Sequence, residues 1–299
     1  LTLLEWILLK CGGMDWFNSL IISMSTAGTG GFAATAESVR EFHSAYTDIV
    51  VTIFMLVFSV NFNLYYLVIL GKIGNVLRDE EFRFYFLFVF LAIFAVTLDN
   101  TFRFAQYGGN FFTSLRYSAF AVASVSSTTG FMTADFAQWS SFSQFVLLLV
   151  MCVGAMAGST GGGLKASRCL ILLKSGRADT LGVLRPTGIH TVKFNKKQLS
   201  PESVSAVRNY FVVYVAIFIF SCLLLSLDAQ TDFLTDVSAV VACFNNVGPG
   251  LGGIVGPCGS YATLNYFSKT VLTIVMLIGR LEIFPVLLLF SPKTWSKRY

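Results

Sequence analysis

Long apolar stretches recur along the chain, and most of them have the length of a membrane-spanning helix. Crossing a bilayer takes roughly 20 mostly apolar residues. Four stretches reach or approach that length: 48–70, 82–98, 142–157 and 209–227. A fifth stretch, 268–290, is long enough but contains Arg280, Glu282 and Pro285, and residues 1–9 have the character of the end of another span. The pattern therefore predicts a chain with several membrane-spanning helices.

Shorter apolar stretches lie between these spans, and each leads into a segment rich in Gly, Thr or Asn. The short stretches are 15–26, 110–127 and 232–245. We name the segments that end them loop A (23–35), loop B (124–136) and loop C (243–257). With Gly31, Gly130 and Gly248 as equivalent points, the spacings are 99 and 118 residues. Such spacings suit a repeated unit of two spans with a half-length helix and a loop between them.

The composition supports a membrane protein. Hydrophobic residues make up 55% of the chain and charged residues 12%, with a mean hydropathy of +0.70. A soluble domain carries about 25% charged residues, so a soluble globular protein, a disordered chain and a nucleic-acid binder are excluded. Six cysteines without a CxxC pair and only two histidines indicate neither a disulfide framework nor a zinc site. No HExxH or GxSxG motif is present, and we expect no enzymatic activity.

The placement of charge predicts an orientation. Fifteen of the 21 Lys and Arg residues lie in 71–83, in 163–208 or at the C-terminus. The positive-inside rule puts these segments in the cytoplasm, so loops A, B and C open to the outside. Acidic residues flank the loops: Asp15, Glu37, Glu41, Asp48, Asp135, Asp228, Asp232 and Asp236. An acidic mouth would attract cations, although an ordinary solvated loop surface explains these residues equally well.

The three loops have the chemistry of a cation filter. Non-helical backbone survives inside a membrane only where it is buried in protein or lines a water-filled path. Backbone carbonyls can replace the hydration shell of K⁺, and glycine reaches the conformations that such a loop needs. The triplets are Thr29-Gly30-Gly31, Thr128-Thr129-Gly130 and Asn246-Val247-Gly248. The alternative is that the loops merely join spans.

Five motifs carry a resemblance to a known family: STAGTGGF (25–32), STTGFMTADF (127–136), GAMAGSTGGGLKASR (154–168), NNVGPGLG (245–252) and GRLEIF (279–284). Over essentially its whole length, the chain resembles the TrkH type of the Trk/Ktr/HKT superfamily of K⁺ transport proteins. The resemblance implies an all-α polytopic membrane fold. In it, four units of outer helix, pore helix, filter loop and inner helix surround a central pore. Loops A, B and C match the second, third and fourth filter loops, so a first repeat is expected before Leu1.

On this resemblance the chain divides into four segments. Residues 1–75 form the second repeat with a truncated outer helix, and 76–175 form the third repeat with a Gly-rich gate loop. Residues 176–208 form a basic cytoplasmic linker, and 209–299 form the fourth repeat. The resemblance also implies that filter carbonyls come from Gly30, Gly31, Thr129, Gly130, Val247 and Gly248. Thr29, Thr128 and Asn246 would lie one step deeper, and K⁺ is the metal expected at these residues.

A glycine cluster points to a gate. Five glycines within 154–163 make a continuous helix implausible, because each costs about 1 kcal/mol relative to Ala. The resemblance implies that 157–165, named here the gate loop, blocks the pore below the filter, with Arg280 facing the pore beside it. The expected gate residues of the loop are Gly158, Ser159, Thr160, Gly161, Gly162, Gly163 and Lys165. A small-residue packing face is the alternative for the loop, and an interhelical ion pair is the alternative for Arg280. Glu282 is expected to pair with a base other than Arg280, since residues two apart do not share a helix face.

The leading interpretation is potassium uptake across the cytoplasmic (inner) membrane of a bacterium through a channel-like pore. A Na⁺-coupled or Na⁺-permeable symporter on the same scaffold is the alternative. K⁺ is the transported ion, and no cofactor is expected on this chain. The resemblance implies membrane lipid, a second copy in a homodimer and a TrkA-like nucleotide-binding regulatory subunit as partners. The regulatory subunit would dock on the basic segment around Lys193, Lys196 and Lys197, which a plain positive-inside loop explains equally well. No nucleic acid is expected.

Overall fold

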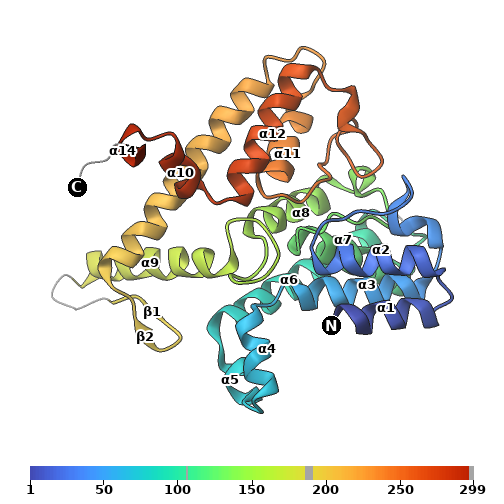
Figure 1. The fold of residues 1–299 in the computed structure, drawn as a ribbon, viewed down its shortest axis with the longest axis horizontal. Coiled ribbons are helices and arrows are strands. Elements are labelled where there is room, and N and C mark those ends of the chain that lie inside the picture. The colour runs from blue at the N-terminus through green and yellow to red at the C-terminus, as the bar shows by residue number, and fades with distance from the viewer. Residues whose placement is uncertain (106, 186–190, 296–299) are drawn as a thin grey trace.

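The computed structural model describes residues 1–105, 107–185 and 191–295, and helices dominate it (Figure 1). The first part of the chain contains α1 (Thr2–Cys11), α2 (Trp16–Ala27), α3 (Ala45–Phe58), α4 (Phe62–Ile69) and α5 (Ile73–Arg78). The middle part contains α6 (Glu80–Leu98), α7 (Phe111–Ser126), α8 (Ser141–Val153) and α9 (Ala166–Leu184). The last part contains β1 (Lys193–Phe194), β2 (Lys197–Gln198), α10 (Pro201–Leu225), α11 (Phe233–Phe244), α12 (Tyr266–Arg280), α13 (Ile283–Leu289) and α14 (Pro292–Trp295).

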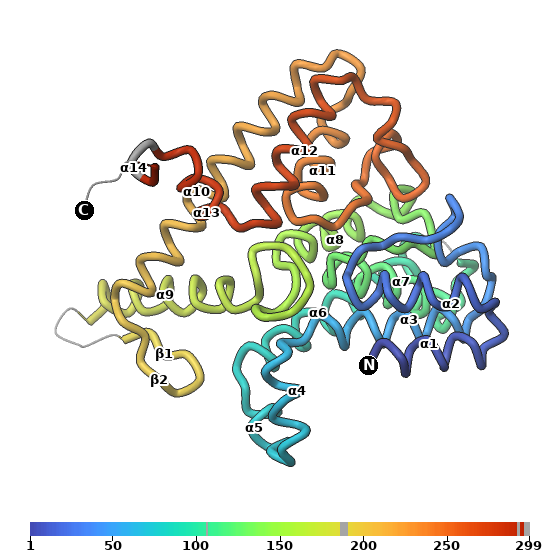
Figure 2. The backbone as a smooth tube through the Cα atoms, in the orientation of Figure 1, coloured from blue at the N-terminus to red at the C-terminus, as the bar shows by residue number. Residues whose placement is uncertain are grey.

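Three groups of helices make up the core. Helices α1 to α3 pack on one another, as do α6 to α8 and α10 to α12. Each group has its own cluster of buried apolar side chains, represented by Met55, Tyr85 and Phe244. Helix α7 also packs on α3, and α8 packs on α11, so the middle group joins the other two. Figure 2 shows this order, with the blue first group and the orange and red last group on either side of the green α7 and α8.

Among the described residues, two helices are long and apolar enough to cross a membrane, and up to four spans result if each of two bent pairs counts as one. The two straight helices are α6, extended by a π-helical turn at Asp99–Arg103, and α10. They cover the predicted spans 82–98 and 209–227. The predicted all-α membrane fold is therefore confirmed in its main feature.

The predicted span 48–70 is wrong as a single straight helix. It consists of α3 and α4, which meet at an angle of 94°. The break at 59–61 contains no proline or glycine, and backbone groups at its start and just after its end bond to the residue before the gate loop and to the loop itself. The Ser59 carbonyl accepts a hydrogen bond from the Met156 N–H at 3.2 Å, and the Phe62 N–H donates to the Gly158 carbonyl at 3.0 Å. The bend is thus decided by a segment about 100 residues away in the chain.

Two other predicted spans also end early. Residues 142–157 are helical only as far as Val153, because Gly154 takes a φ of +67° and turns the chain into the gate loop. Residues 268–290 are divided between α12 and α13, which are bent by 113° where Glu282 takes a φ of +63°. Pro285 lies in the first turn of α13, where a missing N–H costs no helical hydrogen bond.

A small β-hairpin is the one departure from an all-helical chain among the described residues. Strands β1 and β2 pair antiparallel, with Lys193 opposite Gln198 and Phe194 opposite Lys197. Asn195 and Lys196 form the turn, with φ values of +48° and +64°. Two consecutive residues with positive φ match the twist of a tight hairpin, and Asn accepts this conformation more readily than most residues. In Figure 1 the hairpin projects from the junction of α9 and α10.

Candidate functional site

The three predicted half-length helices are present, and each begins with the same kind of cap. Helices α2, α7 and α11 have the side chains of Asp15, Asn110 and Asp232 at their N-termini, where each accepts backbone N–H hydrogen bonds. Hydrogen bonds from Asn18, first from its backbone N–H, hold the pKa of Asp15 below its ordinary value. Asx residues satisfy the free N–H groups of a first helical turn, so these helix starts are set locally.

The loops that follow repeat one backbone pattern. Thr29, Thr128 and Asn246 have φ values of +49°, +57° and +56°, and the glycine two residues later in each loop also has positive φ. These glycines, Gly31, Gly130 and Gly248, are the residues that the sequence analysis treats as equivalent. Left-handed backbone at alternate residues turns successive carbonyls toward one side of a loop. The three loops thus share a geometry as well as a motif.

Loops A, B and C also touch in order. A Cβ on Gly31 would lie 2.1 Å from the Thr129 carbonyl oxygen, and a Cβ on Gly130 would lie 2.2 Å from the Val247 carbonyl oxygen. Any side chain at these two positions would therefore collide with backbone of the neighbouring loop. Among the described residues, nothing lies within 4 Å of the same point on Gly248. The arrangement is a ring of three loops that stays open between loop C and loop A.

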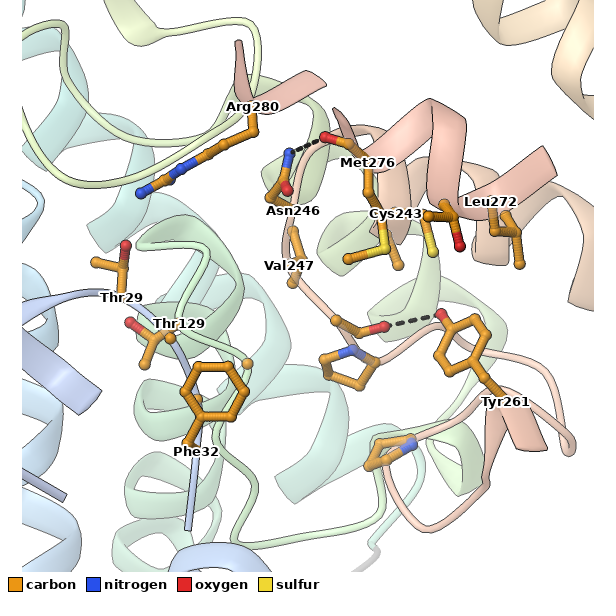
Figure 3. Close-up of a pocket in the computed structure, with 18 of the residues that line it drawn as sticks. Thr29, Phe32, Thr129, Cys243, Asn246, Val247, Tyr261, Leu272, Met276 and Arg280 are labelled. Atoms are coloured by element: carbon orange, nitrogen blue, oxygen red, sulfur yellow. Dashed lines mark hydrogen bonds between the residues drawn. The ribbon is translucent and has the colours of Figure 1, made fainter. Parts of the chain in front are cut away.

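A cavity of about 780 Å³ lies at this ring (Figure 3). It is lined by eight of the nine predicted filter residues: Thr29, Gly30, Gly31, Thr129, Gly130, Asn246, Val247 and Gly248. Arg280 lines it too. Thr128 does not line it, because its hydroxyl is buried and accepts a hydrogen bond from the Gly162 N–H at 2.7 Å. The structure thus brings the predicted filter residues together from three distant parts of the chain.

Tyr261 is a residue of this cavity that the sequence analysis misses. Its hydroxyl donates a hydrogen bond to the Gly248 carbonyl at 2.8 Å, which Figure 3 shows as a dashed line. Burial raises the pKa of the Tyr261 phenol, so the group stays a donor at neutral pH. Asn246 is held as well, since its amide donates to the Met276 carbonyl at 3.4 Å. No spacing in the sequence predicts either contact, because one depends on how loop C folds against the turn at Tyr261–Thr263 and the other on how it folds against α12.

The gate loop lies against the deep ends of all three loops. The Thr29 hydroxyl of loop A donates to the Thr160 carbonyl at 3.0 Å, and Thr128 of loop B holds Gly162. A Cβ on Gly162 would lie 2.4 Å from the Asn245 carbonyl oxygen of loop C. Glycine is needed at this position because the backbones of two loops approach so closely.

The predicted gate residues share a second set of contacts below the loops. The Arg280 guanidinium donates to the Thr160 carbonyl at 2.9 Å, and the Lys165 ammonium donates to the Gly161 carbonyl. Glu282 forms an ion pair with Arg168 at 2.7 Å, as expected for a partner other than Arg280. The Arg168 guanidinium also lies 4.1 Å from the centre of the Tyr210 ring. The break between α12 and α13 is therefore bonded on both sides to the segment around the gate loop.

Several of the acidic residues expected around an outer mouth have structural roles. Asp15, Asp135 and Asp232 cap helical turns, Asp48 lies 3.5 Å from Arg116, and Asp228 accepts a hydrogen bond from Ser268 at 2.8 Å. Within the described residues there is no group of three or more His, Cys, Asp or Glu side chains that could hold a metal ion. The cavity at the ring has no Asp or Glu among its described lining residues, so the oxygen atoms available to a cation there are backbone carbonyls, hydroxyls and the side-chain amide of Asn246.

Comparison with known proteins identifies the family. The TrkH family, described as a cation transport protein, matches residues 9–299. The Trk system potassium uptake protein TrkH of Halomonas elongata is 34% identical over 288 residues, and that of Escherichia coli K12 is 33% identical over 286 residues. Each alignment covers 95% of this chain and 58% of the relative. The chain therefore spans about three fifths of the length of these relatives.

A solved structure agrees with this result. The crystal structure of the potassium transporter TrkH from Vibrio parahaemolyticus matches with a TM-score of 0.92 and 31% sequence identity. The match covers 99% of this chain and 63% of that one. The family is one of cation transport proteins. The chain therefore belongs to the TrkH family of cation transport proteins, and its apolar helices are those of a membrane transporter.

Proposed function

We propose that the chain takes part in potassium uptake through a pore whose filter is formed by loops A, B and C. The contact of one gate loop with the deep ends of all three loops carries this proposal. A single segment that touches every filter loop from below is placed to block or release the path between them. The names of the relatives, which are potassium uptake proteins, support K⁺ as the transported ion.

In this proposal the carbonyls of Gly30, Gly31, Thr129, Gly130, Val247 and Gly248 replace water around the ion. Thr29, Thr128 and Asn246 lie one step deeper, where Thr29 and Thr128 join the filter to the gate loop. The half-length helices point their partially negative C-terminal ends at the same centre, which favours a cation. A fourth loop of this kind beside Gly248 would close the ring between loops C and A.

The gate acts through Gly158 to Gly163, Lys165 and Arg280. Arg280 holds Thr160 and places a positive charge beside the path, which repels cations while the gate loop stays in place. The gate opens when the loop leaves the filter ends. Residues 163–208 face the cytoplasm, and the filter loops face the outside of the bacterial inner membrane.

The exposed lysines of the hairpin suit a regulatory partner. Lys193, Lys196 and Lys197 lie on or beside the turn of β1 and β2, and their side chains are exposed. The proposed partner is a cytoplasmic nucleotide-binding subunit, with the nucleotide on the partner, and two copies of the transport chain form a homodimer. Pull-down with that subunit before and after reversal of the three lysine charges tests the docking site, and unchanged binding would reject it.

The filter is tested with two glycines of loop C. Gly248→Val places a branched side chain at a φ of +105° in the cavity, whereas Gly253 is exposed, has no left-handed backbone and has nothing within 4 Å of a Cβ among the described residues. In the full natural protein, Gly248→Val should abolish K⁺-dependent growth and rubidium uptake, and Gly253→Val should preserve both. Equal uptake in the two variants would sink the filter assignment. Competition by Na⁺ in the same assay would favour a Na⁺-permeable or Na⁺-coupled carrier.

A further inference from the structure

Glu81 is a buried carboxylate that no motif singles out. It lies in the first turn of α6, and only 5% of the residue is exposed. One of its oxygens, Oε1, accepts a hydrogen bond from the Ala157 N–H at 2.7 Å and another from the Ser167 N–H at 3.0 Å. These two N–H groups lie at the beginning of the gate loop and just after its end. A single oxygen atom therefore clamps both ends of the loop to the start of α6.

The two residues before Glu81 hold a different part of the molecule. Asn195, in the turn of the hairpin, donates its N–H to Glu80 Oε2 at 3.0 Å and accepts the Glu80 N–H on its side-chain oxygen at 2.8 Å. Its amide nitrogen also donates to Asp79 Oδ2 at 2.7 Å. Lys174 of α9 adds an ion pair with Glu80 and donates to the Lys193 carbonyl at 2.9 Å. The hairpin is therefore docked on Asp79 and Glu80 by its turn residue.

The three consecutive carboxylates of Asp79, Glu80 and Glu81 thus contact two separate parts of the molecule, the hairpin and the gate loop. The Asp79 side chain also caps α6 by accepting the Phe82 N–H at 2.8 Å, so the first turn of this helix is well ordered. Within one helical turn the backbone is rigid, and a displacement of Glu80 must displace Glu81 with it. The contacts lie 115 and 86 residues apart in the chain, and through them α6 joins the hairpin to the gate loop, beside the contact that Lys174 of α9 makes with the hairpin.

We propose that Asp79, Glu80 and Glu81 form a coupling element that passes the position of the β1–β2 hairpin to the gate loop. Glu81 is a positioning residue in this scheme, because it holds the loop and has no contact with the ion path. When a partner pulls or tilts the hairpin, the start of α6 moves, and the clamp on Ala157 and Ser167 moves with it. The inference rests on the gating role proposed for 157–165 and adds the route by which that gate is controlled.

The test measures exposure of the gate loop separately from transport. In the full natural protein, Ser159→Cys is introduced, and its reaction with a water-soluble maleimide is compared with that of the protein lacking this cysteine. The variants are Glu81→Ala, which removes the clamp, Glu81→Gln, which keeps an oxygen acceptor, and Asn195→Ala. The last removes the two side-chain hydrogen bonds between the hairpin and the start of α6 without touching the loop. Glu202→Ala is the control, since Glu202 is an exposed glutamate in the first turn of α10.

We expect Glu81→Ala and Asn195→Ala to raise the labelling rate about tenfold, as the loss of hydrogen bonds to charged groups implies. Glu81→Gln and Glu202→Ala should stay close to the parent rate. An unchanged rate in Asn195→Ala would overturn the coupling, even if Glu81→Ala shows an effect or does not fold. Rubidium uptake is recorded in membrane vesicles that contain the same variants. Normal uptake with unchanged labelling refutes the coupling alone, whereas absent uptake in the protein without any of these substitutions refutes the proposed function.

Discussion

Loops A, B and C and the gate loop all depend on glycines with positive φ, yet they are held in different ways. Each of the first three follows a capped half-length helix and takes its shape from a left-handed residue and a glycine two positions later. The gate loop has no counterpart among the described residues. It is held by Glu81, Thr29, Thr128 and Arg280, which come from other parts of the chain.

In the proposed function, this difference separates a filter that keeps its shape from a gate that moves. The left-handed geometry repeats in all three loops, and at Gly31 and Gly130 a neighbouring carbonyl leaves no room for a side chain. Long-range hydrogen bonds can be exchanged one at a time at a cost of about 0.5–3 kcal/mol each. If the proposed function is right, the gate loop is therefore the region that a small energy input should move.

The largest effect is expected from a methyl group at Gly130 in the proposed filter. Gly130→Ala forces a Cβ to within 2.2 Å of the Val247 carbonyl oxygen at a φ of +84°. Backbone strain alone costs about 1–3 kcal/mol, so we expect rubidium uptake to fall at least about tenfold. Gly176→Ala, in α9 with open space around its Cβ among the described residues, is the matched control and should transport normally. Similar uptake in both variants would contradict the close packing of loops B and C.

Removal of Arg280 from the proposed gate should raise uptake, whereas the change at Gly130 lowers it. Arg280→Ala deletes the hydrogen bond to the Thr160 carbonyl and the positive charge beside the path. Uptake without an activating partner should rise about threefold to tenfold, because a charged hydrogen bond of this kind is lost. Arg280→Lys keeps the charge and should show a smaller rise. Lower or unchanged uptake in Arg280→Ala would show that the arginine is not part of a barrier.

The ion pair between Arg168 and Glu282 joins α9, the helix after the gate loop, to the break between α12 and α13. Its removal tests whether this connection stabilises the protein. Arg168→Gln removes the ion pair and the contact with the Tyr210 ring, and should lower stability by about 1 kcal/mol. Thermal unfolding in detergent measures the change. Arg177→Gln, an exposed arginine of the same helix, should have almost no effect. Equal unfolding temperatures for the two variants would contradict a stabilising role for the Arg168–Glu282 ion pair.

The smallest expected effect concerns the cap of α2. Hydrogen bonds lower the pKa of Asp15 in the folded protein, so its stabilising effect is present above the unfolded carboxyl pKa of about 3.9. The effect is lost as the pH falls through the lower folded value. Asp15→Ala should therefore lower the unfolding temperature slightly at pH 7 and less at about pH 3. Asp15→Asn keeps a capping oxygen and serves as the control; an equal loss at both pH values would contradict the charged cap.

Local signals explain which parts of the fold were predictable. Helices α2, α7 and α11 lie within a residue or two of their predicted bounds, because a capping side chain starts each one and a Gly- or Asn-containing loop ends it. The bend after Phe58 was not predictable. Its sequence contains no helix breaker other than Asn61, and the bend depends on hydrogen bonds to Met156 and Gly158.

The residues of the candidate site also differ in whether a sequence motif marks them. Eight of the nine predicted filter residues line one cavity, and the signal that marks them is the threefold repetition of a short motif after a half-length helix. Thr128 is turned away from the cavity toward the gate loop, and Tyr261 and Glu81 carry no pattern that marks them.

The sequence by itself determined the apolar helices, the three capped half-helices and the conformations of the loops that follow them. These features depend on neighbouring residues, where hydrophobic period, capping and glycine backbone freedom act over a few positions. Only the tertiary structure decided where the spans bend, how the gate loop meets all three loops and which carboxylate clamps it. Those features are hydrogen bonds between residues 34 to 131 positions apart, and no local pattern encodes the partner of such a bond.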